Sequence, residues 1–246
     1  NRKVFGPLLD ADHLPHTLLP ENRFSRGIPE HGIELADRLE EIIALHDPSN
    51  VAAVMVEPMS GSAGVVIPPA GYLQRLRDIC DRHNILLVFD EVLTGFGRLG
   101  APFGADLFGV TPDIMTLAKN LTNGAIPMGA VVASAEVYRT FMEQDSPAYM
   151  PEFAHGYTYS AHPIACAAGL AAMDIFERER MAERAAALAP HFERQVHTLR
   201  GLRHVVDIRT LGLAAAIQID PIPGEPARRP WAISMAAWKR GLYLRY

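Results

Sequence analysis

The sequence has few of the features that mark secreted, membrane or nucleic-acid-binding proteins. Only two cysteines, Cys80 and Cys166, occur in 246 residues, which argues against a disulfide scaffold and favours a reducing compartment. No apolar run reaches the roughly 18 residues of a membrane span, and the first residues lack a signal-peptide pattern. A formal net charge of −5 without any Lys/Arg run argues against a nucleic-acid surface. We therefore expect a cytoplasmic protein without membrane or nucleic-acid partners.

The composition that remains, 49% hydrophobic and 21% charged residues, is that of an ordinary globular protein. The chain begins at Asn1 and ends at Tyr246 inside a strand-like run, so we expect a piece of a longer protein. His155, His162 and Cys166 do not have the spacing of metal ligands, and we expect no metal site.

Short apolar runs alternate with amphipathic segments in the first half, which predicts an α/β fold. Strand, helix and strand within about 40 residues form a βαβ unit with parallel strands. The expected strands cover residues 51–56, 85–90, 114–118 and 128–134, and the expected helices 32–46 and 71–83. In the second half we expect helices over 163–177, 181–199 and 231–240, a hairpin over 201–219 that turns at Gly212, and a last strand at the chain end.

Two ionisable residues at the ends of apolar runs carry the strongest chemical signal. Asp90 ends one run and Lys119 follows the next. Ligands of open α/β sheets bind at the carboxyl ends of the strands, so a carboxylate and an amine would face one ligand there. A lysine in a mostly apolar pocket can act as a neutral nucleophile near pH 7. Taken singly, Asp90 could cap a helix or pair with a cation, and Lys119 could be a surface lysine.

A glycine-rich turn, Gly95-x-Gly97-x-x-Gly100, matches the letters of the dinucleotide-binding fingerprint. That fingerprint needs its first glycine at the strand tip and a helix that opens at once. Here residues 90–94 intervene, and residues 101–104 do not begin a helix cleanly. We interpret the glycines as a turn that requires positive φ, and keep a nucleotide-dependent oxidoreductase as a less favoured alternative.

Four blocks of sequence together resemble one enzyme family. They are Glu-Pro-Met-Ser-Gly-Ser-Ala-Gly at 57–64, Phe-Asp-Glu-Val-Leu-Thr-Gly-Phe-Gly-Arg at 89–98, Thr-Pro-Asp-Ile-Met-Thr-Leu-Ala-Lys at 111–119 and His-Gly-Tyr-Thr-Tyr-Ser-Ala-His-Pro at 155–163. In order and spacing they resemble the class III (ω) aminotransferases, pyridoxal 5′-phosphate enzymes of fold type I, and within them the β-alanine (ω-amino acid):pyruvate aminotransferases. The resemblance implies a large cofactor-binding domain over 1–165, incomplete at its N-terminus, and a small α+β domain over 166–246, incomplete at its C-terminus.

The resemblance also implies a role for each site residue. Lys119 would form the Schiff base with the cofactor and then act as general base. Asp90 would pair with the pyridine nitrogen and keep it protonated, which makes the ring a better electron sink. Val92 would press on the ring face, and Thr158 would bind the cofactor phosphate of the neighbouring subunit. Arg245 would hold the substrate carboxylate through two parallel hydrogen bonds.

Four further positions bear on the site. Glu57 would orient the site, or would merely accept backbone N–H groups. Ser62 stands where members that use 2-oxoglutarate carry a Glu, so a free Arg245 fits a monocarboxylate such as pyruvate. Leu93 stands where many members carry a Gln that reaches the phenolic oxygen of the cofactor, and Asn120 where a glycine is common.

The expected activity is transfer of an amino group from an ω-amino acid or amine, such as β-alanine, to pyruvate or a similar oxo acid, by a homodimer or homotetramer. An amine transaminase, an aminomutase and a truncated non-catalytic chain are the alternatives. The family's N-terminal portion holds the cofactor phosphate on a helix N-terminus and would be missing here, so we expect these 246 residues alone to be inactive or to bind cofactor weakly.

Overall fold

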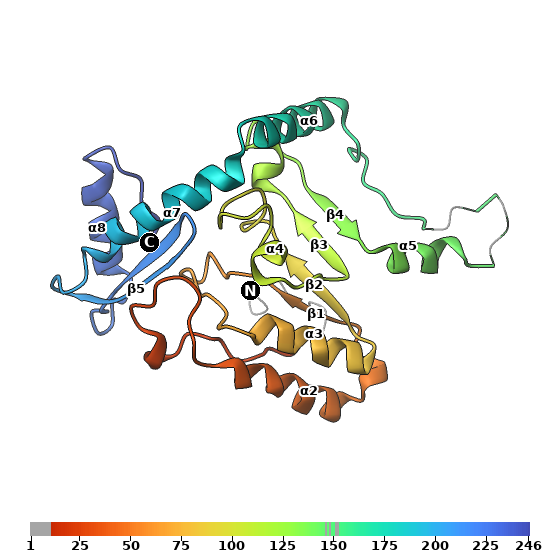
Figure 1. The fold of residues 1–246 in the computed structure, drawn as a ribbon, viewed down its shortest axis with the longest axis horizontal. Helices are drawn as coiled ribbons and strands as arrows, with labels where there is room; N and C mark the ends of the chain where they lie inside the picture. Colours follow the sequence, from red (N-terminus) through yellow and green to blue (C-terminus); the bar gives the residue numbers. More distant parts are fainter. Residues whose placement is uncertain (1–10, 146, 148, 151–152) are drawn as a thin grey trace.

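A four-stranded sheet forms the centre of the molecule (Figure 1). The computed structural model describes residues 11–145, 147, 149–150 and 153–246. The strands lie in the order β1 (Ala53–Val56), β2 (Leu86–Asp90), β3 (Ile114–Leu117) and β4 (Ala130–Ala133). The first three are parallel and β4 runs antiparallel to β3, which confirms the predicted, mostly parallel sheet.

One face of the sheet packs on helices α2 (Arg38–His46) and α3 (Tyr72–His83), which lie along it in Figure 1. On β2, Leu87 and Phe89 are fully buried in this core, whereas Leu86 is 37% exposed, because successive strand residues point to opposite faces. The α3 side chains that meet them recur at helical spacing: Leu73, Leu76, Ile79 and Cys80. The hydrophobic core therefore lies between the sheet and this helix pair.

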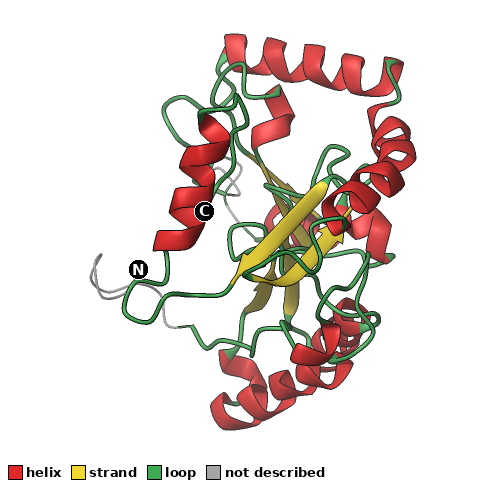
Figure 2. Ribbon diagram, turned by 90° about the vertical axis from the view of Figure 1, so that its left-hand side faces the viewer, coloured by secondary structure: helices red, strands yellow, loops and turns green. Residues whose placement is uncertain are grey.

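Several short elements were not predicted. The segment expected as one helix over 32–46 is a 3₁₀ turn, η2 (Ile33–Asp37), followed by α2. Helices α4 (Gly104–Phe108) and α5 (Ala135–Met142) are additional, as are η1 (Pro20–Asn22), η3 (Pro48–Asn50) and η4 (Lys119–Thr122). Figure 2 shows the helices placed around the strands.

The second half follows the predicted order: α6 (Pro163–Arg178), α7 (Met181–His197), β5 (Val205–Leu211), β6 (Ala214–Ile219) and α8 (Arg228–Trp238). The expected last strand is wrong, since residues 242–246 have no regular structure, and Ser234 of α8 donates a hydrogen bond to the carbonyl of Leu244 (2.6 Å). The proposed boundary at 165/166 falls within α6, which packs on η4, and stays a prediction. Within the described ranges, no helix has the length and apolar character to span a bilayer.

Gly212, in the β5–β6 turn, approaches the first half of the chain closely. Its φ is 57°, and a Cβ there would lie 2.4 Å from the Cα of Leu99 and 2.8 Å from the carbonyl oxygen of Arg98. The next amide, that of Leu213, donates a hydrogen bond to the same Arg98 carbonyl (3.0 Å). The β5–β6 turn can therefore pack against the glycine-rich turn at residues 95–100 only because residue 212 has no side chain.

We predict that Gly212→Ala lowers the free energy of unfolding by about 2–4 kcal/mol, because the methyl group would meet backbone atoms that cannot move aside. Gly201→Ala is the matched control: Gly201 also has positive φ (88°) but has nothing within 4 Å of an added Cβ. It reports the conformational cost alone, about 1 kcal/mol. Urea unfolding of both variants measures the difference, and equal losses would contradict the close approach.

Candidate active site

Asp90 and Lys119 lie at the same edge of the sheet. Asp90 ends β2 and stands in register with Thr116 of β3, and the amide of Glu91 donates to the Thr116 carbonyl (3.0 Å). Lys119 follows Thr116 by three residues, at most about 10 Å of extended chain. The predicted convergence of a carboxylate and an amine at the carboxyl ends of adjacent parallel strands thus agrees with the backbone arrangement.

The Asp90 carboxylate is half-buried and locally anchored. Its Oδ1 accepts a hydrogen bond from the backbone N–H of Val92 (3.0 Å), a short-range contact that fixes the side chain relative to the turn. Val92 is itself half-buried. The arrangement presents an acceptor of fixed orientation at the end of β2.

Lys119 has an unusual backbone. It begins η4 with φ of 48°, in the left-handed region that residues with a Cβ rarely adopt. Such conformations persist where the surroundings impose them and are concentrated at functional sites. The side chain is exposed, so the apolar pocket expected around this amine is not formed by the residues that the structure describes. An apolar pocket around Lys119 therefore stays a prediction.

Glu91 is the residue at this edge that sequence reasoning missed. It is 1% exposed, and its carboxylate accepts hydrogen bonds from the Thr94 hydroxyl and from the amides of Gly104 (2.8 Å) and Ala105 (2.7 Å). A carboxylate at a helix N-terminus satisfies amides that have no partner within the helix. The first residue of α4 is a glycine because a Cβ on Gly104 would lie 2.6 Å from the Cβ of Pro58. Adjacent acidic residues therefore have opposite tasks, Asp90 toward the site and Glu91 toward the interior.

The glycine-rich turn is structural, as interpreted. Gly97 and Gly100 have φ of 89° and 87°, which confirms the expected positive φ at two of the three glycines. Gly95 is required for space instead, since a Cβ there would lie 2.9 Å from the carbonyl oxygen of Glu91. A helix follows only at Gly104, so the turn lacks the helix start that a dinucleotide phosphate needs.

Glu57 and Ser62 lie in the segment that follows β1 at the same edge of the sheet. Glu57 is half-buried, and its Oε2 accepts the amide hydrogen of Gly61 (3.3 Å), which favours the simpler of the two roles expected for it. Ser62 is exposed at the tip of a turn closed by the Ser60–Val66 bridge.

Thr158 and Arg245 are both exposed. Thr158 lies in the segment that precedes α6, and Arg245 lies beyond α8; Figure 1 places these two parts of the chain on opposite sides of the sheet. The described part of one chain therefore does not bring them together. A position for Thr158 in a neighbouring subunit's site remains a prediction.

Two hollows lie near β3, one at each end of the strand. A cavity of about 560 Å³ lies at the amino end of β3, lined in part by Asp113, Met115 and Ser134, opposite to the end that carries Asp90. A second, of about 380 Å³, lies beside the start of α6, lined in part by Tyr157 and His162. Neither contains Asp90 or Lys119. The described residues hold no cluster of three or more potential metal ligands.

Tyr72, Cys80 and His197 are ionisable groups in the interior whose pKa is shifted by burial. Burial raises the pKa of the Cys80 thiol to about 11, so Cys80 is not a reactive thiolate. Burial and the nearby Arg26 lower the pKa of His197, whose Nε2 lies 3.3 Å from the Thr210 hydroxyl. The pKa shifts of Cys80 and His197 result from their packing in the interior.

Comparisons with known proteins cover nearly the whole chain. A family model described as aminotransferase class-III matches residues 5–246. The chain is 61% identical to a β-alanine–pyruvate aminotransferase of Pseudomonas aeruginosa and to an ω-amino acid–pyruvate aminotransferase of Pseudomonas putida, over all of this chain and 55% of each relative. It therefore spans about half the length of the curated relatives it matches.

Solved structures agree. An (S)-enantioselective ω-transaminase from Thermomicrobium roseum matches with a TM-score of 0.80 at 35% identity, over 86% of this chain and 48% of that one. A PLP-bound amine transaminase from an uncultivated Pseudomonas species matches with a TM-score of 0.80 at 39% identity, over 86% and 49%.

We predict that Glu91→Gln lowers the free energy of unfolding by about 2–3 kcal/mol, because an amide cannot supply all the acceptor positions that the buried carboxylate supplies. Glu136→Gln is the control, since Glu136 also lies in the first turn of a helix but is exposed. We expect it to cost at most about 1 kcal/mol. Thermal and urea unfolding measure both, and equal effects would refute the anchoring role of Glu91.

Proposed function

The chain belongs to the class-III aminotransferases, and from that premise we propose that its full-length protein is a pyridoxal-phosphate-dependent transaminase. It transfers an amino group from an ω-amino acid or amine to pyruvate or a similar oxo acid. The observation that carries the proposal is the half-buried Asp90 carboxylate at one strand tip beside the strained Lys119 at the next.

The carboxylate and the amine at the strand tips fit the cofactor. The anchored carboxylate of Asp90 suits a protonated pyridine nitrogen, and the exposed primary amine of Lys119 suits an aldehyde. When bound, the cofactor supplies an electron sink for the carbanion formed at the substrate. Pyridoxal 5′-phosphate is therefore the cofactor we propose, with Val92 beside Asp90 against the ring.

The chain's own groups then have distinct tasks. Asp90 would keep the proton on the ring nitrogen, and the Nζ of Lys119 would take a proton from the substrate carbon that bears the amine and return it two atoms away, a 1,3-proton shift. Arg245 binds the substrate carboxylate. Thr158 serves the neighbouring subunit, which implies a homodimer or homotetramer, and we place the enzyme in the cytoplasm.

A broader amine transaminase is the second candidate, because solved relatives at 35–39% identity are described as ω- or amine transaminases. The donor decides between the two: β-alanine as the preferred donor supports the first, and amines without a carboxylate support the second. Residues beyond this chain contribute to that choice, since it spans about half the length of its relatives.

We predict that borohydride reduction of the full-length protein with pyridoxal phosphate attaches the cofactor to the peptide that contains Lys119. Lys119→Ala abolishes both the attachment and transamination, because Lys119 is the lysine that the described residues place at this strand tip. Lys239→Ala, at an exposed lysine beside α8, leaves both intact. Peptide mass spectrometry and an alanine-formation assay measure the result. Labelling of another lysine would refute the assignment, and a nicotinamide-dependent activity would favour an oxidoreductase.

We predict that Asp90→Asn lowers kcat by on the order of a hundredfold or more, because an amide cannot hold the ring nitrogen in its protonated form. Asp174→Asn, on the exposed side of α6, is the control and is expected to stay within about twofold. Steady-state kinetics with saturating pyruvate measure kcat. A loss below about threefold at Asp90 would contradict its pairing with the cofactor ring.

A further inference from the structure

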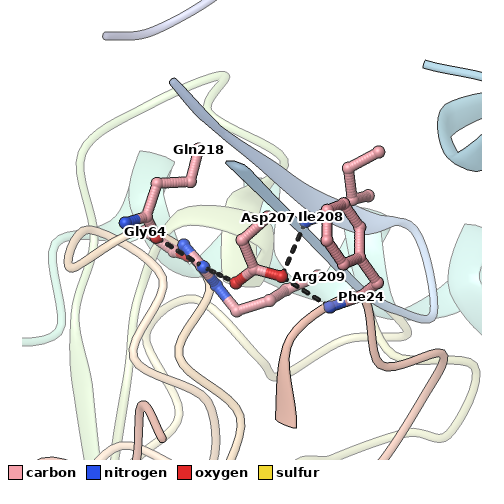
Figure 3. A network of polar contacts seen from close by, with 6 residues as sticks. All are labelled: Phe24, Gly64, Asp207, Ile208, Arg209 and Gln218. Atoms are coloured by element: carbon pink, nitrogen blue, oxygen red, sulfur yellow. Dashed lines mark hydrogen bonds and ion pairs between the residues drawn. The ribbon is translucent and has the colours of Figure 1, made fainter. Parts of the chain in front are cut away.

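A buried ion pair joins the C-terminal hairpin to the first half of the chain. Arg209 and Asp207 of β5 form it, with side chains 7% and 3% exposed. The Oδ1 of Asp207 also accepts the amides of Phe24 (2.6 Å) and Ile208 (2.8 Å), as Figure 3 shows. Removal of one partner of such a pair would leave an uncompensated buried charge, so the two residues act as a unit.

Arg209 reaches across to the turn that follows β1. Its Nε and Nη2 both donate to the carbonyl oxygen of Gly64 (3.1 and 2.8 Å), and its Nη1 donates to Oε1 of Gln218 (2.8 Å) (Figure 3). One edge of the planar guanidinium thus holds Gly64 while Nη1 faces Asp207. A lysine ammonium cannot make both contacts in this geometry.

The turn held by Arg209 is strained. Gly64 has φ of 101°, and Val65, a buried β-branched residue, has φ of 53°. A β-branched residue at positive φ is a genuine outlier, and it persists only where neighbouring structure holds it. The amides of Gly64 and Val65 both donate to the Gly61 carbonyl (3.1 Å each), which closes the turn.

The other side of the turn packs against Leu93, three residues beyond Asp90. A Cβ on Gly61 would lie 1.6 Å from Cδ2 of Leu93, so the Leu93 side chain lies directly on the Gly61 backbone. The turn is therefore clamped between Leu93 and Arg209, and Ser62 lies at its exposed tip. The positions of Ser62 and Leu93 are coupled through this packing.

We propose that Arg209, oriented by Asp207, is a positioning residue for the oxo-acid acceptor. It holds the strained turn, and with it Ser62, against Leu93 at the edge of the candidate site. The inference rests on the proposed function, because it gives Ser62 a place beside the acceptor carboxylate. Loss of the clamp lets the turn relax and displaces Ser62, while Asp90 and Lys119 stay fixed by the β2–β3 register.

The test is the double variant D207N/R209M in the full-length protein. Asparagine at position 207 still accepts the two amides, methionine fills the volume of the arginine stem, and no unpaired buried charge remains. Arg203→Met, at an exposed arginine that precedes β5, is the control. Hydrogen exchange over residues 60–66, the KM for pyruvate, kcat and the cofactor absorbance are measured.

In D207N/R209M we expect exchange at Gly64 and Val65 to speed up at least about tenfold. We expect the KM for pyruvate to rise about fivefold or more, with kcat within about twofold and the cofactor absorbance unchanged. Unchanged exchange would overturn the clamp. Faster exchange with an unchanged KM, or an equal loss in kcat, would overturn the acceptor role.

A failure to fold and a failure of the proposed function can each be told apart from a failure of the clamp. If circular dichroism shows that the double variant does not fold, Arg209→Lys is used instead, which keeps a cation beside Asp207 but loses the two hydrogen bonds to Gly64. The same changes in hydrogen exchange and in the KM for pyruvate then test the proposal. If the unaltered protein has no transaminase activity, the proposed function fails and the acceptor role fails with it, while hydrogen exchange still reports on the clamp itself.

Discussion

The buried carboxylate of Glu91 is the interaction on which the site end of this molecule depends. An ionised group is costly to bury unless charge-assisted hydrogen bonds replace its water. Glu91 obtains them from Thr94 and from the first amides of α4, so the chain after β2 must fold back over the strand tip. That return shapes the turn after Asp90 and leaves Asp90 at its edge.

The turn so formed, residues 92–100, is also where distant parts of the chain meet. Gly61 packs on Leu93, and Gly212 packs on Leu99. Gly97 and Gly100 approach helix α7 closely enough that an added Cβ would lie 3.4 and 3.1 Å from its Cα atoms. The glycine spacing that resembles a nucleotide fingerprint is therefore explained by backbone contact. One turn couples the strand tip, the segment after β1 and the C-terminal hairpin.

The proposed catalytic groups differ in how the described chain supports them. Asp90 is half-buried and anchored, whereas Lys119, Thr158 and Arg245 are exposed. The chain spans about half the length of its curated relatives. The proposed function would require further parts of the enzyme to cover these side chains. Under that proposal, the group that would keep the ring nitrogen protonated belongs to the sheet, and the groups that would meet the substrate are exposed.

The sequence by itself determined the four strands of the large sheet, the parallel βαβ unit and the edge at which Asp90 and Lys119 occur, because apolar runs and helical periodicity are local properties of the chain. It also determined the family, through four ordered blocks. Only the tertiary structure decided that Glu91 rather than Asp90 is fully buried and that α4 begins at Gly104. It also decided that the backbone of Lys119 is in the left-handed region and that its side chain is exposed. It alone joined Arg209 to Gly64, 145 positions apart. Burial, strain and such distant contacts arise from the packing of segments against one another, and no local pattern of residues records which segments meet.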